Sequence, residues 1–366
     1  MQRSHPPFRA DHVGSLLRPR RLKEARAKYA AGQMPADELK AIEDDAIKAV
    51  AARQESIGLH AITDGEMRRA YWHFDFLAGL DGVEMVEAEG IKFAGVTSKA
   101  EAPFVKGKLG SRLHPQIAHF EYLKAVSGRT PKMSIPSPSM LHYRGGRKMI
   151  DRGVYPDMEA FYSDLGQAYR KVIHDLYAAG CRYLQLDDCS FAYLCDPAQR
   201  RMLQDRGDDP DRQGEIYAGM INAALEGRPK DLVVTTHVCR GNFRSTFIAS
   251  GGYAPIADLL FNRVNVDGYF LEWDSDRAGG FEPLRLLPKN KRVVLGLITS
   301  KTGAIENSDF VRRRIDEAAK FTPLDQLCLS PQCGFASTEE GNVLAEDEQW
   351  AKLRLVTELA GEVWGR

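Results

Sequence analysis

The stretch 232-LVVTTHVCRGN-242 is the starting point for the fold that we expect for this chain. Residues Leu232 to Val238 are mostly β-branched or apolar, which is typical of a strand buried in a parallel sheet. Two reactive residues, His237 and Cys239, stand where this strand ends. Catalytic groups of a (β/α)₈ barrel gather at the C-terminal ends of its strands, so the stretch favours that architecture.

Short apolar runs alternate with amphipathic stretches along the rest of the chain. This alternation is typical of strand and helix units that build a parallel sheet wrapped by helices. We count eight candidate strands, the number that closes a barrel, and predict an α/β fold with a single (β/α)₈ TIM barrel. The predicted strands are Asp11–Gly14, Ala61–Asp64, Lys132–Pro136, Tyr183–Asp187, Leu232–Val238, Gly268–Trp273, Arg292–Ile298 and Leu327–Ser330.

Four stretches carry apolar residues at helical spacing. The first two predicted helices end at glycines, which tolerate the left-handed backbone of a helix C-terminus. Gln54 alone breaks the apolar stripe of the first helix. The predicted helices open near Pro35, Asp157, Ser308 (as N-cap) and Glu346, and Gly58 and Gly180 end the first two.

Residues 82–110 do not fit the barrel repeat. Pairs of apolar residues, among them Val83 with Met85 and Phe104 with Val105, indicate short strands. We expect a small β insertion after the second strand, acting as a lid or an interface. Because no fixed internal period or long flexible linker divides the chain, we predict one domain over residues 1–366.

Charge and composition favour a small-molecule enzyme of the cytoplasm. The chain has 50 basic and 50 acidic residues, so it lacks the net charge that nucleic-acid or anionic-membrane partners demand. No long uncharged apolar stretch indicates a membrane span or a secretion signal. The six cysteines follow no compact spacing, which is typical of free thiols or metal ligands in a reducing compartment.

Three predicted strands end in residues that bind soft metals. His237 and Cys239 are two positions apart on an extended run, so their side chains point to one face. Glu272 ends the sixth strand and Cys333 follows the eighth. Thiolates with an imidazole and a carboxylate suit zinc better than magnesium or calcium. Two alternatives stay open: buried residues that only pack, and a metal-free site where His237 activates Cys239 as nucleophile.

Six motifs stand in order along nearly the whole chain. They are HVGSLLRP at 12–19, TDGEMRR at 63–69, LQLDD at 184–188, HVCRGNFRS at 237–245, YFLEWD at 269–274 and SPQCGF at 330–335. With these motifs the sequence resembles the catalytic C-terminal half of the cobalamin-independent methionine synthases. It is more similar still to their short stand-alone paralogues, which resemble methyltetrahydropteroyltriglutamate homocysteine methyltransferases.

The resemblance implies a zinc barrel and a thiol substrate. By analogy, the residues that match the zinc ligands of the family are His237, Cys239, Glu272 and Cys333. The sulfur of the substrate, homocysteine, would join the metal and become an attacking thiolate. The positions that hold the amino acid part of homocysteine match Ser15, Glu66 and Asp187.

The chain departs from the family where the methyl donor binds. In the long enzymes a Trp stacks on the folate, and a His after the seventh strand protonates the leaving amine. Here residues 134–141 read SIPSPSML, without Trp, and Lys301 lies close to the expected His. Lys301 and His142 are therefore the candidate proton donors. Arg18 and Arg240 could bind a carboxylate or phosphate of either substrate, although surface or structural roles are alternatives.

We expect a zinc-dependent methyltransferase of methionine biosynthesis. The methyl donor is open among methyltetrahydrofolate, a methylated corrinoid protein and another small methyl compound. An alternative keeps the fold and the metal but opens an epoxide with the thiol. A metal-free decarboxylase-like barrel and a non-catalytic thiol-binding protein are further alternatives. The apolar insertion and the C-terminal helix suggest a homodimer.

Overall fold

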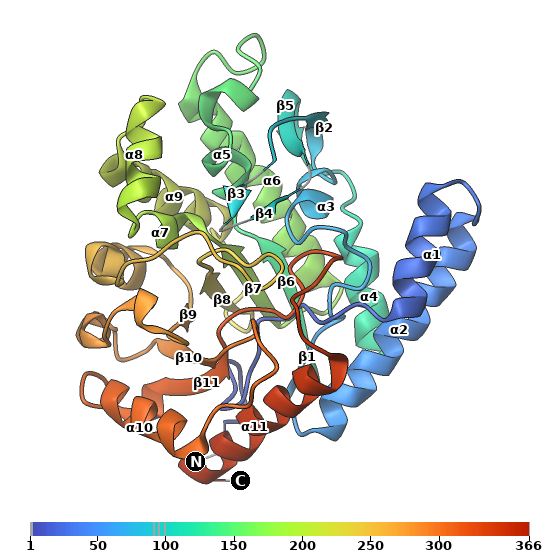
Figure 1. The fold of residues 1–366 in the computed structure, drawn as a ribbon. Coiled ribbons are helices and arrows are strands. Elements are labelled where there is room, and N and C mark those ends of the chain that lie inside the picture. Colours follow the sequence, from blue (N-terminus) through green and yellow to red (C-terminus); the bar gives the residue numbers. More distant parts are fainter. Residues whose placement is uncertain (1–2, 91, 94–95, 99, 366) are drawn as a thin grey trace.

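Seven parallel strands form the central sheet of this computed structural model, which describes residues 3–90, 92–93, 96–98 and 100–365. The sheet has the order β1-β6-β7-β8-β9-β10-β11 and curls so that helices surround it (Figure 1). Seven of the eight predicted strands are confirmed, with ends that shift by a few residues. The strands are β1 (Ala61–Ile62), β6 (Thr130–Pro136), β7 (Tyr183–Asp188), β8 (Val233–Val238), β9 (Gly268–Glu272), β10 (Arg292–Ile298) and β11 (Leu327–Pro331).

The first predicted strand, Asp11–Gly14, does not form. The residue before this segment, Ala10, forms an isolated bridge with Leu329 of β11. The carbonyl oxygens of three successive residues accept hydrogen bonds from side chains in or next to the sheet. These bonds replace the backbone hydrogen bonds that a neighbouring strand would supply. The bonds run from Lys132 to His12 (2.6 Å), from Gln185 to Val13 and from Thr63 to Gly14 (both 2.7 Å).

The four predicted helices are confirmed as α2 (Ala36–Ser56), α6 (Met158–Ala178), α10 (Ser308–Ala318) and α11 (Glu346–Trp364). The predicted cap of α10 is wrong by one position, because the Asn307 side chain accepts the hydrogen bond from the Phe310 amide at 3.0 Å. An amide oxygen serves as well as a hydroxyl at this position.

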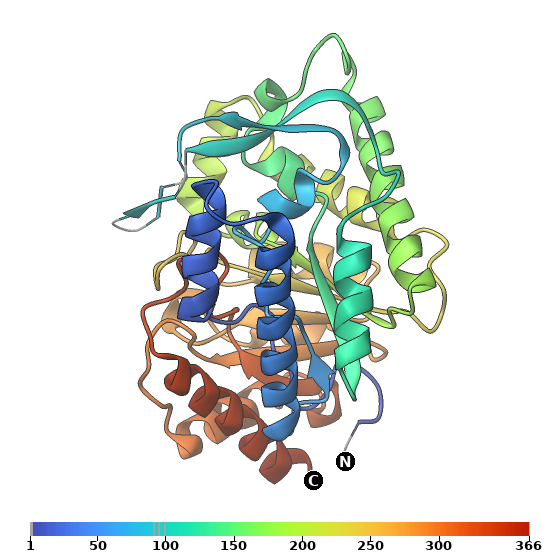
Figure 2. The ribbon, with the colours of Figure 1, turned by 90° about the vertical axis from the view of Figure 1, so that its right-hand side faces the viewer.

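Further helices cover the remaining faces of the sheet. Figure 2 shows α1 and α2 as a pair of neighbouring helices beside α4. Among the described helices, none combines the length and the apolar character that a bilayer crossing needs. The other helices are α1 (Arg20–Ala30), α3 (Phe74–Leu77), α4 (Gln116–Val126), α5 (Met140–Tyr143), α7 (Ser190–Tyr193), α8 (Pro197–Asp205) and α9 (Pro210–Ala224).

Gln54, the exception in the apolar stripe of α2, is fully buried. Its amide donates to the Thr63 carbonyl at 2.9 Å and accepts from the Thr63 amide at the same distance. The side chain therefore continues the backbone pairing of β1 beyond Ile62. It fixes the start of the turn that carries Glu66 into the site described below.

Residues 81–110 form two antiparallel ribbons outside the seven-stranded sheet. β2 (Asp81–Glu87) pairs with β5 (Glu101–Gly110), and β3 (Lys92–Phe93) pairs with β4 (Val96–Thr97). Gly82 has a positive φ of 84°, and a Cβ there would lie 2.5 Å from the Lys108 carbonyl oxygen. Residues 91, 94, 95 and 99 of the predicted insertion lie outside the described residues.

A buried ion pair ties the N-terminal segment to the interior of the sheet. The Lys132 ammonium lies 3.1 Å from the Asp11 carboxylate, and neither side chain is exposed. The ammonium also lies 4.0 Å from the centre of the Phe270 ring, and the Tyr183 hydroxyl donates to Asp11 at 2.8 Å. Burying two charges is tolerated here because both make further polar contacts.

Lys132→Met should lower the free energy of unfolding by about 3–5 kcal/mol, because Asp11 would remain buried without its cation. Urea unfolding followed by circular dichroism measures the change. Lys171→Met is the matched control, since Lys171 pairs with Asp175 on the exposed surface of α6. A loss no larger than that of the control would contradict the role given to the buried pair.

Candidate metal and thiol site

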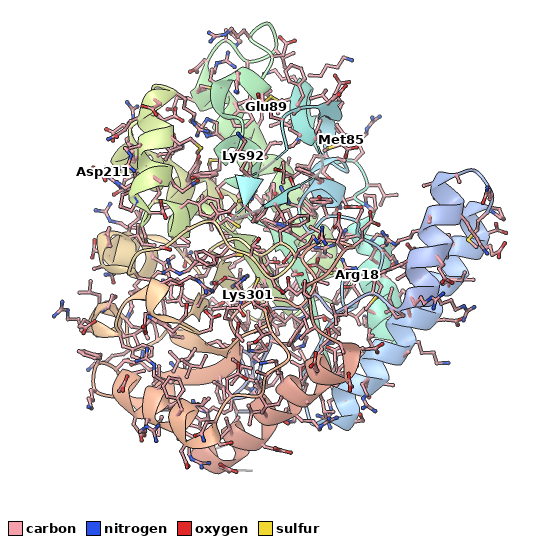
Figure 3. All side chains as sticks on the ribbon, in the orientation of Figure 1. Arg18, Met85, Glu89, Lys92, Asp211 and Lys301 are labelled. Atoms are coloured by element: carbon pink, nitrogen blue, oxygen red, sulfur yellow. The ribbon has the colours of Figure 1, made fainter. Side chains whose placement is uncertain are left out.

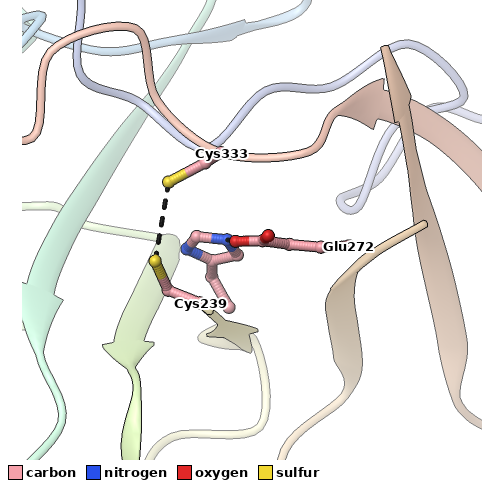
Figure 4. Close-up of side chains that lie close together, drawn as sticks. Cys239, Glu272 and Cys333 are labelled. Atoms are coloured by element: carbon pink, nitrogen blue, oxygen red, sulfur yellow. Dashed lines mark hydrogen bonds and ion pairs between the residues drawn. The ribbon is translucent and has the colours of Figure 1, made fainter. Parts of the chain in front are cut away.

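Four potential metal ligands meet at the carboxyl ends of three strands. His237 belongs to β8 and Cys239 follows it, Glu272 ends β9, and Cys333 comes just after β11. One ligand atom from each residue lies within 4.8 Å of all the others, and all four side chains are buried. We call these four residues the ligand cluster. Figure 4 shows Cys239 and Cys333 facing each other, with the Glu272 carboxylate directed toward them.

The spacing inside the ligand cluster fits a tetrahedral zinc ion. The two sulfur atoms of Cys239 and Cys333 are 3.7 Å apart. The Nε2 atom of His237 lies 3.8 Å from Oε1 of Glu272. Ligands at zinc bond lengths of about 2.0–2.3 Å in tetrahedral geometry are about 3.3–3.8 Å apart. These residues could therefore hold zinc with little movement, as the sequence predicts.

The electrostatics of the ligand cluster also call for a cation. Burial opposes a charge on His237, yet Asp187, Cys333 and Glu272 together raise its pKa to about 9. The contact with Cys189, together with burial, raises the pKa of Cys239 well above its ordinary value. A bound divalent ion would replace these protons, because metal ligands must be deprotonated.

Neighbouring groups fix the orientation of two ligands. Oδ1 of Asp187 lies 3.4 Å from Nδ1 of His237, which leaves Nε2 for the cluster. The Arg240 amide donates to one Glu272 oxygen and Arg277 to the other, each at 3.0 Å. Burial alone would raise the pKa of Glu272, but Arg277, followed by Lys301 and His237, lowers it below its ordinary value. Glu272 is thus held as a carboxylate.

A cavity lies against the ligand cluster. Its lining contains three members of the cluster, His237, Cys239 and Cys333. It also contains the three predicted substrate residues, Ser15, Glu66 and Asp187.

Glu66 lines this cavity, and one of its carboxylate oxygens has no hydrogen-bond partner among the described residues. Its backbone is left-handed, with φ 58°, because the turn after β1 brings it round to face the sheet. Oε1 lies 3.4 Å from Arg69 and accepts from Ser134 at 3.3 Å. Oε2 accepts no hydrogen bond from the described residues and lies 3.9 Å from Arg18. Burial raises the pKa of Glu66 to about 7.

A close backbone approach places Ser15 at the cavity, and a side-chain hydrogen bond orients Asp187 there. A Cβ at Gly334 would lie 1.9 Å from the Ser15 hydroxyl, so only glycine allows this approach. The Ser15 carbonyl accepts from the Phe335 amide at 2.9 Å. Asp187 accepts from the Gln185 side chain at 2.7 Å.

The two predicted proton donors lie in different surroundings. The Lys301 ammonium donates to the Asn242 side chain and to the Thr246 carbonyl, both at 3.0 Å. Asn242 in turn lines the cavity. His142 is buried with its Nδ1 3.0 Å from the Tyr217 hydroxyl, and burial lowers its pKa to about 4. His142 is not among the described residues that line the cavity, and its geometry favours a packing role.

The two predicted anion-binding arginines make structural contacts. Arg18 donates to the carbonyls of Leu16 (3.0 Å), Ala336 (2.6 Å) and Arg69 (3.1 Å). The Arg240 guanidinium lies buried 4.4 Å from the centre of the Tyr253 ring. Figure 3 labels Arg18 and Lys301, which both lie toward the middle of the view.

The cavity lining also includes residues that sequence reasoning did not single out. They are Tyr71, Trp72, His73, Arg144 and Cys189. A signal was present for three of them, because the run YWHF follows the TDGE motif closely and combines aromatic rings with an imidazole. Arg144 and Cys189 follow other predicted strands, and their positions alone do not distinguish them from structural residues.

Residues 8–361 match the family described as the cobalamin-independent synthase, catalytic domain. The uncharacterised protein YxjH of Bacillus subtilis is 53% identical over 361 residues, which cover 98% of this chain and 95% of YxjH. A methionine synthase of Saccharolobus solfataricus is 26% identical over 336 residues, covering 88% of this chain and 86% of that enzyme.

Among solved structures, the chain is similar to one from Listeria monocytogenes that is provisionally assigned as a vitamin-B12-independent methionine synthase. The two chains are 42% identical, and each is covered in full. Their TM-score is 0.81, so the arrangement of strands and helices is shared.

We expect the protein to bind one zinc ion per chain at the ligand cluster. Cys239→Ser should lower zinc affinity by more than about 100-fold, because losing a ligand costs more than losing one of its neighbours. Metal analysis and competition with a chromogenic chelator measure the change. Cys181→Ser is the matched control, since this buried thiol lies outside the cluster and bonds the Tyr183 carbonyl at 3.4 Å. Wild-type zinc content in the Cys239 variant would refute the site.

Proposed function

The chain belongs to the cobalamin-independent methionine synthase family, and from this premise we propose that it transfers a methyl group to the sulfur of homocysteine, giving methionine. One observation supports this proposal above others. The ligand cluster, which could hold a thiol through zinc, borders the same cavity as Glu66 and Asp187, whose carboxylates suit an ammonium group. Homocysteine carries both groups on one small molecule.

The chemistry that a zinc ion supplies when bound is activation of the substrate sulfur. A free thiol with a pKa of about 8.5 is mostly protonated at neutral pH, whereas coordination keeps it as thiolate. The chain's own residues hold the ligands in place for this task. Asp187 orients His237, and Arg277 keeps Glu272 charged and fixed.

The amino acid part of homocysteine would lie between Glu66 and Asp187. Oε2 of Glu66 accepts no hydrogen bond from the described residues, so it is free to accept one from an ammonium group. The Ser15 hydroxyl lies at the same cavity and could bond the carboxylate of the substrate. These contacts would set the distance between the substrate's α-carbon and the ligand cluster.

Methyl transfer is an in-line displacement at carbon. A bond forms between the homocysteine sulfur and the methyl carbon, and the bond from that carbon to the donor's leaving atom breaks. The electron pair of the broken bond goes to the leaving atom, which then takes a proton if it is an amine. We retain Lys301 as a candidate source of that proton, because its ammonium bonds Asn242 at the cavity.

We also infer that residues 1–366 form one barrel domain with residues 82–110 as an insertion. The segment from Ala10 to Gly14 would take the place of the eighth strand between β11 and β1. Its bridge to Leu329 and the 3.1 Å contact between His12 Nε2 and the Ala61 carbonyl support this reading.

Zinc-loaded protein should convert homocysteine to methionine with a methyl donor. We would supply methyl iodide, 5-methyltetrahydrofolate or methylcobalamin and detect methionine by mass spectrometry. Removing zinc should lower the rate by more than about 100-fold, since the thiol would then be largely protonated and unpositioned. Adding zinc back should restore the rate. Absence of methionine with all three donors, or thioether formation only with an epoxide, would refute the proposal.

Binding of methionine should weaken as the pH falls below about 7. The pKa of Glu66 is raised to about 7 by burial, so this group is charged above that pH and neutral below it. Only the charged form pairs with an ammonium, so Kd should rise toward about tenfold per pH unit in acid. Calorimetry between pH 5.5 and 8 measures this slope. Glu66→Gln should bind more weakly and lose the slope, and an unchanged slope would exclude Glu66 as its source.

A further inference from the structure

Arg240 is a buried cation that directly follows Cys239 of the ligand cluster in the chain. Its side chain is 0% exposed, and all three guanidinium nitrogens lack a hydrogen-bond partner among the described residues. Buried polar atoms in folded proteins nearly always have such partners, and a buried charge without them is costly. The charge of Arg240 therefore needs a reason other than local hydrogen bonding.

The backbone of Arg240 is held in place from both sides. Its amide donates to Oε1 of Glu272 at 3.0 Å, and its carbonyl accepts from the amides of Ile248 and Ala249, both at 3.0 Å. Gly241 follows with a positive φ of 89°, so the chain turns directly after Arg240. Arg240 is thus anchored through its backbone, and one of these bonds leads to a member of the ligand cluster.

The side chain of Arg240 is also connected to Glu272, through Tyr253. The guanidinium lies 4.4 Å from the centre of the Tyr253 ring, within the range of a cation–π contact. The Tyr253 hydroxyl accepts from the Glu272 amide at 2.9 Å and donates to the Glu272 carbonyl at 3.3 Å. Burial opposes the charge of Arg240, but Tyr253 and then Glu272 raise its pKa above the ordinary value. A permanent cation therefore lies within electrostatic reach of a ligand.

The charges of the ligand cluster show what this cation could do. Two thiolates and one carboxylate would carry three negative charges, against the two positive charges of a divalent ion. A substrate sulfur that binds as thiolate brings one more negative charge into the buried site. A nearby cation offsets that charge, because charges interact strongly where water is excluded.

Three cations act on Glu272, and they differ in how their charge is shared. Arg277 lies 3.0 Å from Glu272 and 2.8 Å from Asp274, so a second carboxylate shares its charge. Lys301, the candidate proton donor, lowers the pKa of Glu272 as well. Arg240 makes no side-chain hydrogen bond to an acidic group of the described residues, so its charge remains to act on the ligand cluster.

We propose that Arg240 is a positioning residue that makes the site prefer an anionic sulfur over a neutral one, and so the thiol substrate over the methylated product. The inference rests on the proposed methyl transfer. Arg240 is not among the described residues that line the cavity, so it would act through its charge and through Glu272. Once methylated, the sulfur is a neutral thioether, and its attraction to Arg240 is lost. The fixed cation would thus favour both substrate binding and product release.

The test compares the binding of homocysteine and of methionine to zinc-loaded, full-length protein by calorimetry, without a methyl donor. Arg240→Met keeps a long side chain against Tyr253 but removes the charge. It should raise the Kd of homocysteine by at least about tenfold, because the bound thiolate loses the attraction of a buried cation. The Kd of methionine, whose sulfur is neutral, should stay unchanged.

A spectroscopic measurement follows the sulfur itself. With Co²⁺ in place of zinc, a bound thiolate adds a sulfur-to-metal charge-transfer band, whereas a thioether does not bring a negative charge to the metal. The homocysteine concentration at which this band reaches half its height should rise in Arg240→Met as the calorimetric Kd does.

Three further variants separate charge from folding. Arg240→Lys restores a cation and should recover most of the affinity for homocysteine. Arg240→Gln is a second uncharged variant and should behave as Arg240→Met, so either one supports the comparison if the other fails to fold. Arg263→Met is the matched control, since Arg263 pairs with Glu215 on the exposed surface, and it should bind as wild type. Metal analysis and thermal unfolding show whether each variant is loaded and folded.

Three results would overturn this inference. The first is an equal loss of homocysteine and methionine binding in the uncharged variants, which would mean that Arg240 serves only the fold. The second is unchanged homocysteine binding in those variants. The third is an Arg240→Lys variant that binds homocysteine no better than Arg240→Met. A protein that shows the expected contrast but forms no methionine with any donor would refute the methyl transfer alone, so the two proposals fail separately.

Discussion

The anionic side chains of the ligand cluster are buried together at the carboxyl ends of the strands, and they need a shared cation. Cys239, Glu272 and Cys333 lie at the carboxyl ends of β8, β9 and β11, and the parallel pairing of β8, β9, β10 and β11 brings these ends to one edge of the sheet. Without a metal, the two thiols and His237 must stay protonated, and their protons share the space between the ligands. With a divalent ion, thiolates and carboxylate are satisfied at once, so metal binding and the local fold support each other.

The N-terminal segment connects the interior of the sheet to the cavity at the carboxyl ends of the strands. The side chains of Lys132 and Gln185 bind the carbonyls of His12 and Val13, respectively. These bonds fix the path of the chain from His12 to Ser15. Gly334 lets Ser15 pass within contact distance of the loop that follows β11. The buried ion pair of Lys132 and Asp11 thereby helps to set the position of a side chain at the cavity.

Much of this arrangement could be predicted from the sequence, because strand ends and apolar periodicity are local signals. Seven strands, four of the helices and the convergence of the ligand cluster follow from them. The irregular first segment could not be predicted, since its hydrogen bonds come from side chains distant in sequence. Nor could the surroundings of His142, because only the packed structure places it against Tyr217 and away from the cavity lining.

Charged residues of both signs line the cavity, and their charges affect which orientation of an amino acid is favourable. Acidic Glu66 and Asp187 attract an ammonium group, whereas Arg144 beside the neutral ring of His73 repels it. An amino acid that entered in the reverse orientation would place its ammonium near Arg144 and its carboxylate near Glu66, and both contacts are unfavourable. Like-charge repulsion therefore supports the same orientation as the attractive contacts. Under the proposed function, that orientation directs the homocysteine sulfur to the ligand cluster.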